Sequence, residues 1–139
     1  MGLFDRLVGN KAEPLSPQAG LLLSAITMIA ADGDIDDDEL AIIRRLDGSK
    51  TTTAWESAVK TWKANSIQDC ISISAQAMNQ DQRLAAMANL IDIAMADGSL
   101  HGNEQQLLEA YIEAFAVDVT IVEKIVEVVS LKNNKAVFN

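Results

Sequence analysis

The chain has 139 residues, of which 49% are hydrophobic, and its 20 acidic and 11 basic side chains give a formal net charge of −9. This length predicts one domain with a hydrophobic core and is too short for two ordinary domains. The negative charge argues against nucleic acid as a partner, because affinity for phosphates depends on clustered Lys and Arg.

The first half of the chain predicts helices separated by short acidic or polar turns. Both prolines, Pro14 and Pro17, precede the long periodic segments, which favours an all-α fold. The first helix is expected from Ser16 or Pro17 to Ala31, with the proline in its first turn. A second helix is expected to begin near Asp36. Its inward face is expected to carry Leu40, Ile43 and Leu46.

Two capping signals predict the next helices. Thr53 and Glu56 have the spacing of a capping box, and the helix they open is expected to bury a stripe of Trp55, Ala58, Val59 and Trp62. Ser66 is expected to cap the following helix. The buried stripe of that helix is expected to consist of Ile67, Cys70, Ile71, Ser74 and Met78.

Three helices are expected in the remainder. The first runs from about Asn79 to Ala96, and the second buries Leu108, Tyr111, Ile112 and Phe115. The third is capped by Thr120 and Glu123, and its inward side chains are expected to be Ile121, Ile125, Val128 and Val129. No alternating β-branched run appears, so no sheet is expected. The sequence therefore predicts a single all-α domain of about seven helices.

One acidic turn is repeated along the chain. The octapeptide Asp32–Glu39 recurs in weakened form as Asp97–Glu104, at an offset of 65 residues. Each copy follows an almost wholly apolar helix and precedes an amphipathic one. This pattern predicts an internal duplication with a pseudo-two-fold relation between residues 18–46 and residues 83–111.

The duplicated turns form a candidate cation site. If the pseudo-two-fold brings them together, their carboxylates converge on one spot. The expected metal ligands are Asp32, Glu39, Asp97 and Glu104, with Asp34 and Asp36 as additional ligands. Mutual repulsion among carboxylates favours a bound cation. Oxygen ligands select hard cations, so Ca²⁺ or Mg²⁺ is expected rather than Zn²⁺.

The same residues have a second interpretation, as helix caps. Asp36 as N-cap with Glu39 three positions later forms a capping box that complements the helix dipole. The second copy fits less well, because His101, a poor N-cap, stands at the equivalent position. Asp32 and Asp97 stand at helix C-termini, where the dipole disfavours an anion. Each is therefore expected to have a cationic partner, whether a metal, Lys or Arg.

At this point the sequence resembles a known family. The segments Leu3–Leu7, Ala30–Ile35 and Ala96–Gly98, together with Glu39 and Glu104, are similar to the tellurite-resistance protein B (TerB) family. The helical domain of that family also occurs in a membrane-anchored J-domain co-chaperone. The resemblance covers roughly residues 16–131. It implies a compact all-helical bacterial domain with a divalent-cation site built from the acidic turns.

The resemblance also implies work with partner proteins in a response to metal or chemical stress, including proteins of membrane-associated complexes. The second acidic turn departs from the family pattern. There Ser99, His101, Gly102 and Asn103 replace much of the acidity, so the site is expected to be lopsided.

The expected domain boundaries leave two flanking segments. Residues 1–15 precede the TerB-like domain at 16–131, and residues 132–139 form a C-terminal tail. No apolar stretch reaches the roughly 20 residues that span a bilayer, and Met1–Val8 lacks the features of a secretory signal. Cys70 is the only cysteine, which favours a reducing compartment. A cytoplasmic protein is expected, or one held peripherally at the inner face of the membrane, where any direct contact involves residues 1–8.

Three functions remain open from the sequence. The favoured one is a non-enzymatic, divalent-cation-responsive interaction module of the tellurite-resistance and stress-response type. The second is a metal-independent acidic adaptor for other proteins. The third is a carboxylate-based, metal-dependent hydrolase, although neither a Ser-His-Asp or Cys-His set nor a glycine-rich phosphate loop is present. No catalytic residue and no cofactor-binding residue other than the metal ligands is expected.

Overall fold

The structure is a computed structural model that describes residues 15–32, 43, 45, 52–96 and 102–138. Within these ranges the chain forms six α-helices and two short 3₁₀ helices, with no strand. The all-α prediction is confirmed. The elements are α2 (Pro17–Ile29), η1 (Ala30–Asp32), α4 (Thr52–Ala64), α5 (Ile67–Ala77), α6 (Gln80–Ala94), α7 (Gly102–Phe115), α8 (Val119–Asn133) and η2 (Lys135–Phe138).

Two features of the prediction depend on residues outside these ranges. Ile43 and Arg45 are helical, but most of the expected second helix and both acidic loops lie outside the described residues. The total of about seven helices therefore stays a prediction, and so does the internal duplication. The ends of two helices have the spacing that the duplication predicts. Helix α2 ends at Ile29 and α6 ends at Ala94, an offset of 65 residues.

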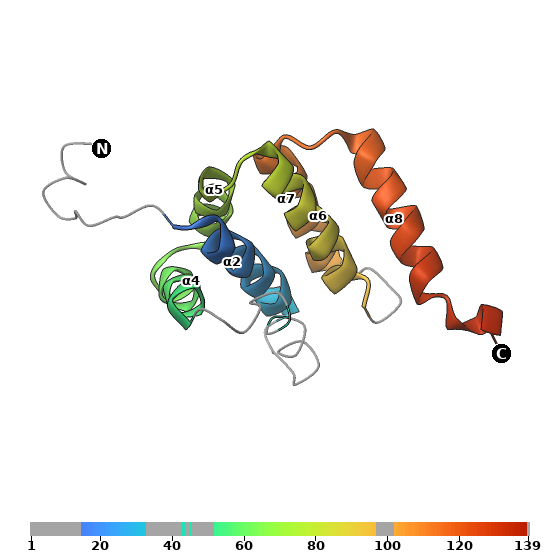
Figure 1. Ribbon diagram of the computed structural model, residues 1–139, viewed down its shortest axis with the longest axis horizontal. Coiled ribbons are helices and arrows are strands. Elements are labelled where there is room, and N and C mark those ends of the chain that lie inside the picture. Colours follow the sequence, from blue (N-terminus) through green and yellow to red (C-terminus); the bar gives the residue numbers. More distant parts are fainter. Residues whose placement is uncertain (1–14, 33–42, 44, 46–51, 97–101, 139) are drawn as a thin grey trace, which may run out of the picture.

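Helix α2 is the centre of the domain. It packs against α4, α5 and α6 and also contacts α7 (Figure 1). Every residue from Leu22 to Ile29 is buried, as its apolar composition on all sides predicts. The two polar residues in this run satisfy their hydroxyls within the helix, because Ser24 donates to the carbonyl of Leu21 and Thr27 to that of Leu23, each at 2.7 Å.

Local signals explain where α2 begins and how closely it packs. Ser16 is the N-cap, its hydroxyl accepts from the amide of Ala19 at 3.1 Å, and Pro17 occupies the first helical position as predicted. Gly20 lies at the crossing with α5. A Cβ at this glycine would stand 2.8 Å from the Cβ of Ala77, so the absence of a side chain permits the close approach.

The capping predictions for α4 and α5 had different outcomes. Helix α4 already includes Thr52, so the prediction that Thr53 is its N-cap is wrong. Ser66 does cap α5, and its hydroxyl accepts from the amide of Asp69 at 3.1 Å. The predicted stripe of α5 is buried from Cys70 onward, whereas Ile67 is 54% exposed because it opens the helix at the rim of a groove.

Helix α8 lies at the edge of the molecule and packs chiefly on α6 (Figure 1). Its N-cap is Asp118, whose carboxylate accepts from the amide of Thr120 at 2.8 Å, so the predicted cap at Thr120 is wrong. The predicted inward face is also partly wrong. Val129 is buried, but Ile121 and Val128 are 39% and 64% exposed, and Val122 is buried in their place.

Candidate functional site

Most of the predicted ligands lie outside the described residues. Glu39 and Asp97, with the additional candidates Asp34 and Asp36, cannot be placed, and the same holds for His101. The backbone of Asp32 is described, but its side chain is not. Glu104 is the one predicted ligand whose side chain is described. The site is therefore built from Glu104 and from the elements that carry its expected neighbours.

Glu104 is a buried carboxylate. Only 6% of its surface is exposed, and it is the one charged side chain in the buried class within the described part of the chain. Removing a carboxylate from water is costly unless cations or hydrogen-bond donors compensate. Its place in the first turn of α7 supplies part of this compensation, because the positive end of a helix dipole stabilises an anion.

The start of α7 meets the end of the α2 segment. After Ile29 the chain tightens into η1, which ends at Asp32, and α7 contacts η1. This contact brings the backbone that carries Asp32 beside the helix that carries Glu104. Two of the four principal ligands therefore belong to elements that touch, one from each copy of the motif, although the elements are far apart in sequence.

Glu104 also occupies a capping position. Because α7 begins at Gly102, Glu104 is the third residue of the helix, where a glutamate can reach back to the backbone amide of the N-cap. The cap itself would be His101, outside the described residues. The capping interpretation of the second copy is thus stronger than the sequence alone indicates, and it remains open beside the cation interpretation.

A groove opens next to these elements. It has a volume of about 340 Å³ and lies between η1, the first half of α5 and α7. Its apolar part consists of Ala31, Ile67, Ile71, Leu107 and Ala110, and its polar part consists of Gln68, Asn103 and Gln106. No charged side chain lines it, although 22% of the chain is charged. Ala31 and Asn103 directly precede Asp32 and Glu104, so groove and acidic site share the same backbone.

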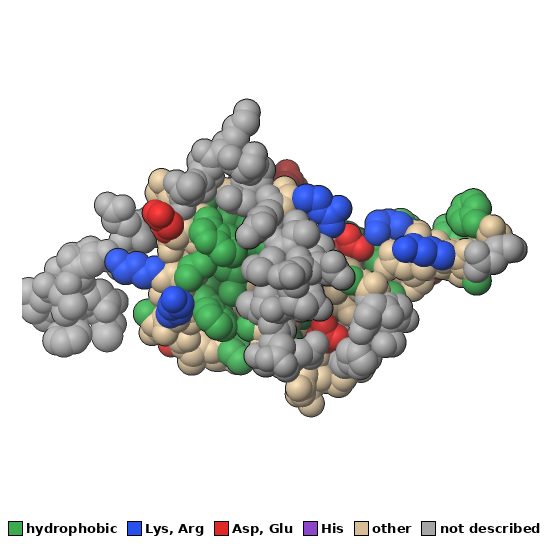
Figure 2. Space-filling model, turned by 90° about the horizontal axis from the view of Figure 1, so that it is seen from below, with side chains coloured by type: hydrophobic (Ala, Val, Ile, Leu, Met, Phe, Trp, Pro, Cys, Tyr) green, Lys and Arg blue, Asp and Glu red, His purple; other side chains and the backbone are tan. Residues whose placement is uncertain are grey.

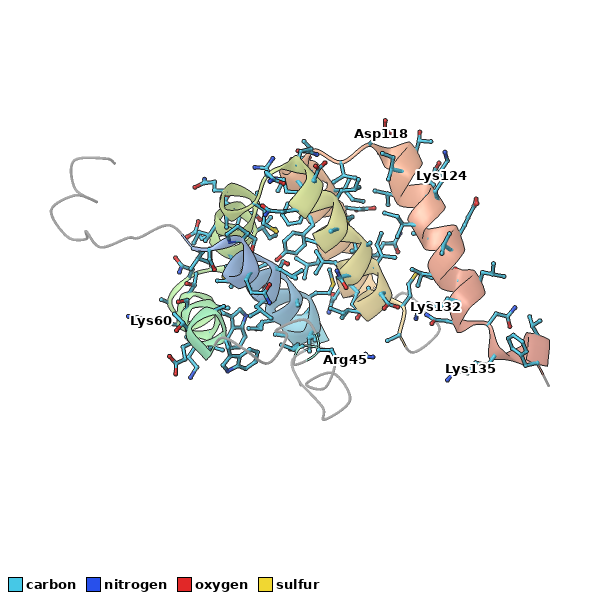
Figure 3. All side chains as sticks on the ribbon, viewed as in Figure 1. Arg45, Lys60, Asp118, Lys124, Lys132 and Lys135 are labelled. Atoms are coloured by element: carbon cyan, nitrogen blue, oxygen red, sulfur yellow. The ribbon has the colours of Figure 1, made fainter. Side chains whose placement is uncertain are left out.

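The side chain of Lys132 lies near the end of α6. Lys132 donates to Asp92 at 3.2 Å, and the side-chain amide of Asn133 donates to the carbonyl of Met95 at 3.2 Å. These contacts hold the end of α8 against the end of α6, just before the second acidic turn. Figure 3 shows Lys132 and Arg45 extending toward this end of the molecule.

A family model for the tellurite resistance protein TerB matches residues 49–126. This stretch is more than half of the chain and runs from just before α4 into α8. The chain belongs to the TerB family. No curated protein and no solved structure gives a significant match.

The TerB match covers the second acidic turn and not the first. Asp97 and Glu104 lie inside the matched residues, whereas Asp32 and Glu39 lie before them. Membership of the TerB family confirms the resemblance and agrees with a tellurite-resistance type of module. The matched region also contains both walls of the groove in α5 and α7.

The structure also contains a buried polar cluster that the sequence did not predict. Thr27, Cys70, Ser74 and Tyr111 come from α2, α5 and α7 and are each 1% exposed or less. Burial raises the pKa of the Cys70 thiol, and burial also raises the pKa of the Tyr111 hydroxyl against the opposing effect of Thr27. Both groups are therefore neutral near pH 7. Cys70 is a core residue, as expected, rather than a ligand.

The described residues contain no group of three or more His, Cys, Asp or Glu side chains arranged to hold a metal. Since most predicted ligands lie outside these residues, the cation site stays a prediction. No helix in the same residues is long and apolar enough to cross a membrane.

Proposed function

We propose that this TerB-family protein is a non-enzymatic, divalent-cation-responsive interaction module. In this proposal the acidic turns at the ends of the two core helices hold Ca²⁺ or Mg²⁺ through Asp32, Glu39, Asp97 and Glu104. The partners are other proteins of a stress-response or membrane-associated complex. Nucleic acid is not among them, because the chain carries a net charge of −9.

The burial of Glu104 beside η1 is the observation that carries this proposal. A carboxylate that is 6% exposed, in a helix that touches the element ending in Asp32, fits the donor set of a hard cation. When bound, such a cation neutralises carboxylates that otherwise repel one another. The capping role of Glu104 alone does not require an acidic residue at the end of η1, where the helix dipole is unfavourable.

The groove is a partner-binding surface that adjoins the proposed cation site. Carboxylates held together at Asp32 and Glu104 would fix the neighbouring Ala31 and Asn103, which both line the groove. An apolar side chain of a partner fits among Ile71, Leu107 and Ala110, while the amides at the rim can pair with its backbone. Occupancy of the acidic turns would then alter partner affinity through the two elements that both sites share.

The metal-independent adaptor is the second candidate, and the position of Glu104 at the third residue of α7 favours it. In that case the acidic turns cap helices, and the acidic surface itself binds a basic partner. The two functions differ in their response to added cations, whereas both leave the protein without catalytic activity. A hydrolase has no further support from the described side chains.

Thermal unfolding with and without Ca²⁺ or Mg²⁺ separates these candidates. Cation binding to the folded state stabilises it by about 2.7 kcal/mol when the free cation exceeds the dissociation constant a hundredfold. We expect the wild-type melting temperature to rise, and Glu104→Gln to abolish the rise. Glu109→Gln, which removes an exposed carboxylate from the same helix, is the matched control and should respond like the wild type. Equal responses of the two variants would contradict the role of Glu104.

A further inference from the structure

The two helices that form the walls of the groove carry acidic side chains and no basic ones. Helix α5 contains Asp69, and α7 contains Glu104, Glu109 and Glu113, whereas neither helix contains Lys or Arg. The Lys and Arg residues that the structure describes lie elsewhere in the fold, namely Arg45, Lys60, Lys63, Arg83, Lys124, Lys132 and Lys135. Figure 2 shows Lys and Arg side chains toward both ends of the face that it presents. The charge of the groove walls is therefore of one sign.

Two of these carboxylates lie along the open edge of the groove. Gln106 lines the groove from α7, and Glu109 and Glu113 follow it by three and seven residues, which places all three on one side of the helix. All three side chains are exposed. The apolar lining at Leu107 and Ala110 is thus bordered by an acidic ridge that consists of Glu109 and Glu113.

The acidic ridge opposes the stability of its own helix. Glu109 and Glu113 are four residues apart, a spacing at which like charges repel each other. Glu113 also lies in the last turn of α7, where the helix dipole disfavours an anion and no basic residue compensates. Neither carboxylate forms an ion pair with the described part of the chain. Local conflicts of this kind are typical of functional sites rather than of structural ones.

We propose that the groove and its acidic ridge bind a basic amphipathic helix of a partner protein. An apolar side chain of that helix enters the groove, and Lys or Arg residues three or four positions apart pair with Glu109 and Glu113. This spacing follows from the ridge, because residues four apart in a helix are separated by roughly 6 Å along its axis. The inference rests on the proposed function, since it names the chemistry of the partner that the groove receives.

The fold and the charge argue against the other classes of occupant. The described residues form no strand, so an extended peptide has no sheet edge among them to join, whereas two helical walls suit a helix laid into a groove. The acidic ridge repels anionic phospholipid and the phosphates of nucleic acid. A basic amphipathic helix neutralises both carboxylates and covers the apolar lining in the same contact.

Selection of displayed random peptides against the full chain tests the proposal. The peptides are about 16 residues long, roughly four helical turns. Those that bind should share an apolar residue and two Lys or Arg residues three or four positions apart. A selected peptide, once synthesised, should bind the Glu109→Gln, Glu113→Gln double variant about threefold to tenfold more weakly than the wild type, because each exposed ion pair contributes little. High salt should weaken the wild-type complex, because it screens these pairs.

The matched control is the Glu123→Gln, Glu127→Gln double variant. These carboxylates are also exposed and four residues apart, but they belong to α8, which does not line the groove. The control should bind the selected peptide as the wild type does. Ala110→Leu, which fills the groove, should weaken binding by about tenfold or more, because it takes the space of the peptide's apolar anchor.

Three results would overturn the proposal: no binding peptide, selected peptides without paired basic residues, or equal affinities for the two double variants. A consensus that matches a segment of this chain would assign the groove to a second copy instead. The selected peptide also separates this inference from the proposed cation response when its affinity is measured in a chelator and again in Ca²⁺ or Mg²⁺. Equal affinities would contradict the cation response and leave the basic helix as the occupant. A rise in melting temperature with cations, without any binding peptide, would contradict the occupant alone.

Discussion

Cys70 shows how burial determines the chemistry of a single side chain. Its thiol has no exposed surface, and burial raises its pKa, opposed by Thr27 and assisted by the nearby Asp69. A thiol reacts and binds metals as the thiolate, so Cys70 is chemically inert in the folded protein. The sequence predicted this role from the position of Cys70 in an apolar stripe. It could not predict that Thr27 and Tyr111 would meet the thiol, because they come from other helices.

The raised pKa of Cys70 predicts alkaline sensitivity. The folded state holds the thiol proton more tightly than the unfolded chain does, so the stabilisation is complete below the unfolded pKa of about 8.5. It is lost as pH rises through the folded-state pKa. Chemical denaturation from neutral pH to about pH 10 should show a declining free energy of unfolding, and Cys70→Ala should flatten this decline. Parallel pH profiles for the two proteins would contradict the assignment.

Two glycines should respond in opposite ways to the same substitution. Gly20→Ala forces a Cβ to 2.8 Å from Ala77 at the crossing of α2 and α5, and should destabilise the domain by about 1–2 kcal/mol after the gain in helix propensity. A Cβ at Gly102 meets nothing within 4 Å, so Gly102→Ala should stabilise by roughly 0.5–1 kcal/mol. Denaturant midpoints measure both. A higher free energy of unfolding for Gly20→Ala would show that α2 and α5 can move apart without loss of stability.

At the scale of helices, the sequence located most elements but not all of their ends. Ser66 is an N-cap as expected. Ser16 and Asn79 are the N-caps of helices that were expected to begin near them, and Asn79 forms a complete capping box with Gln82. A Thr-x-x-Glu pattern is short enough to arise inside a helix, which is why Thr53 and Thr120 were assigned wrongly. The buried face of α8 also differed, because a helix rich in valine and isoleucine offers several apolar faces and only its contact with α6 selects one.

The corrected cap of α8 can be tested directly. Asp118 accepts the amide of Thr120 at 2.8 Å, so Asp118→Ala should destabilise the protein by about 0.5–2 kcal/mol. Thr120 is exposed within the first turn, and Thr120→Ala should change the stability little. The free energy of unfolding of both variants gives the comparison. A larger loss at Thr120 than at Asp118 would restore the cap that the sequence suggested.

At the scale of the whole molecule, helix composition predicted the centre of the fold. The apolar α2 is enclosed by its neighbours, because a helix without a polar face must be buried on all sides. Helix α7, which carries Glu104, contacts η1, which ends at Asp32, and the approach of the two complete acidic turns stays a prediction. The burial of Glu104 could not be derived from its sequence neighbours, since it depends on how α7 packs. The groove likewise arises from the packing of α5 on α7.

Calorimetric titration of the demetallated protein with Ca²⁺, Mg²⁺ and Zn²⁺ tests the proposed cation response. We expect saturable binding of Ca²⁺ or Mg²⁺ in preference to Zn²⁺, and strong weakening by Asp32→Asn, Asp97→Asn and Glu104→Gln, because hard cations depend on the number and charge of oxygen ligands. Glu109→Gln should bind as the wild type does. The absence of binding heat for every cation, with no change in the melting temperature, would contradict the cation site and leave the metal-independent adaptor as the function of this TerB-family protein.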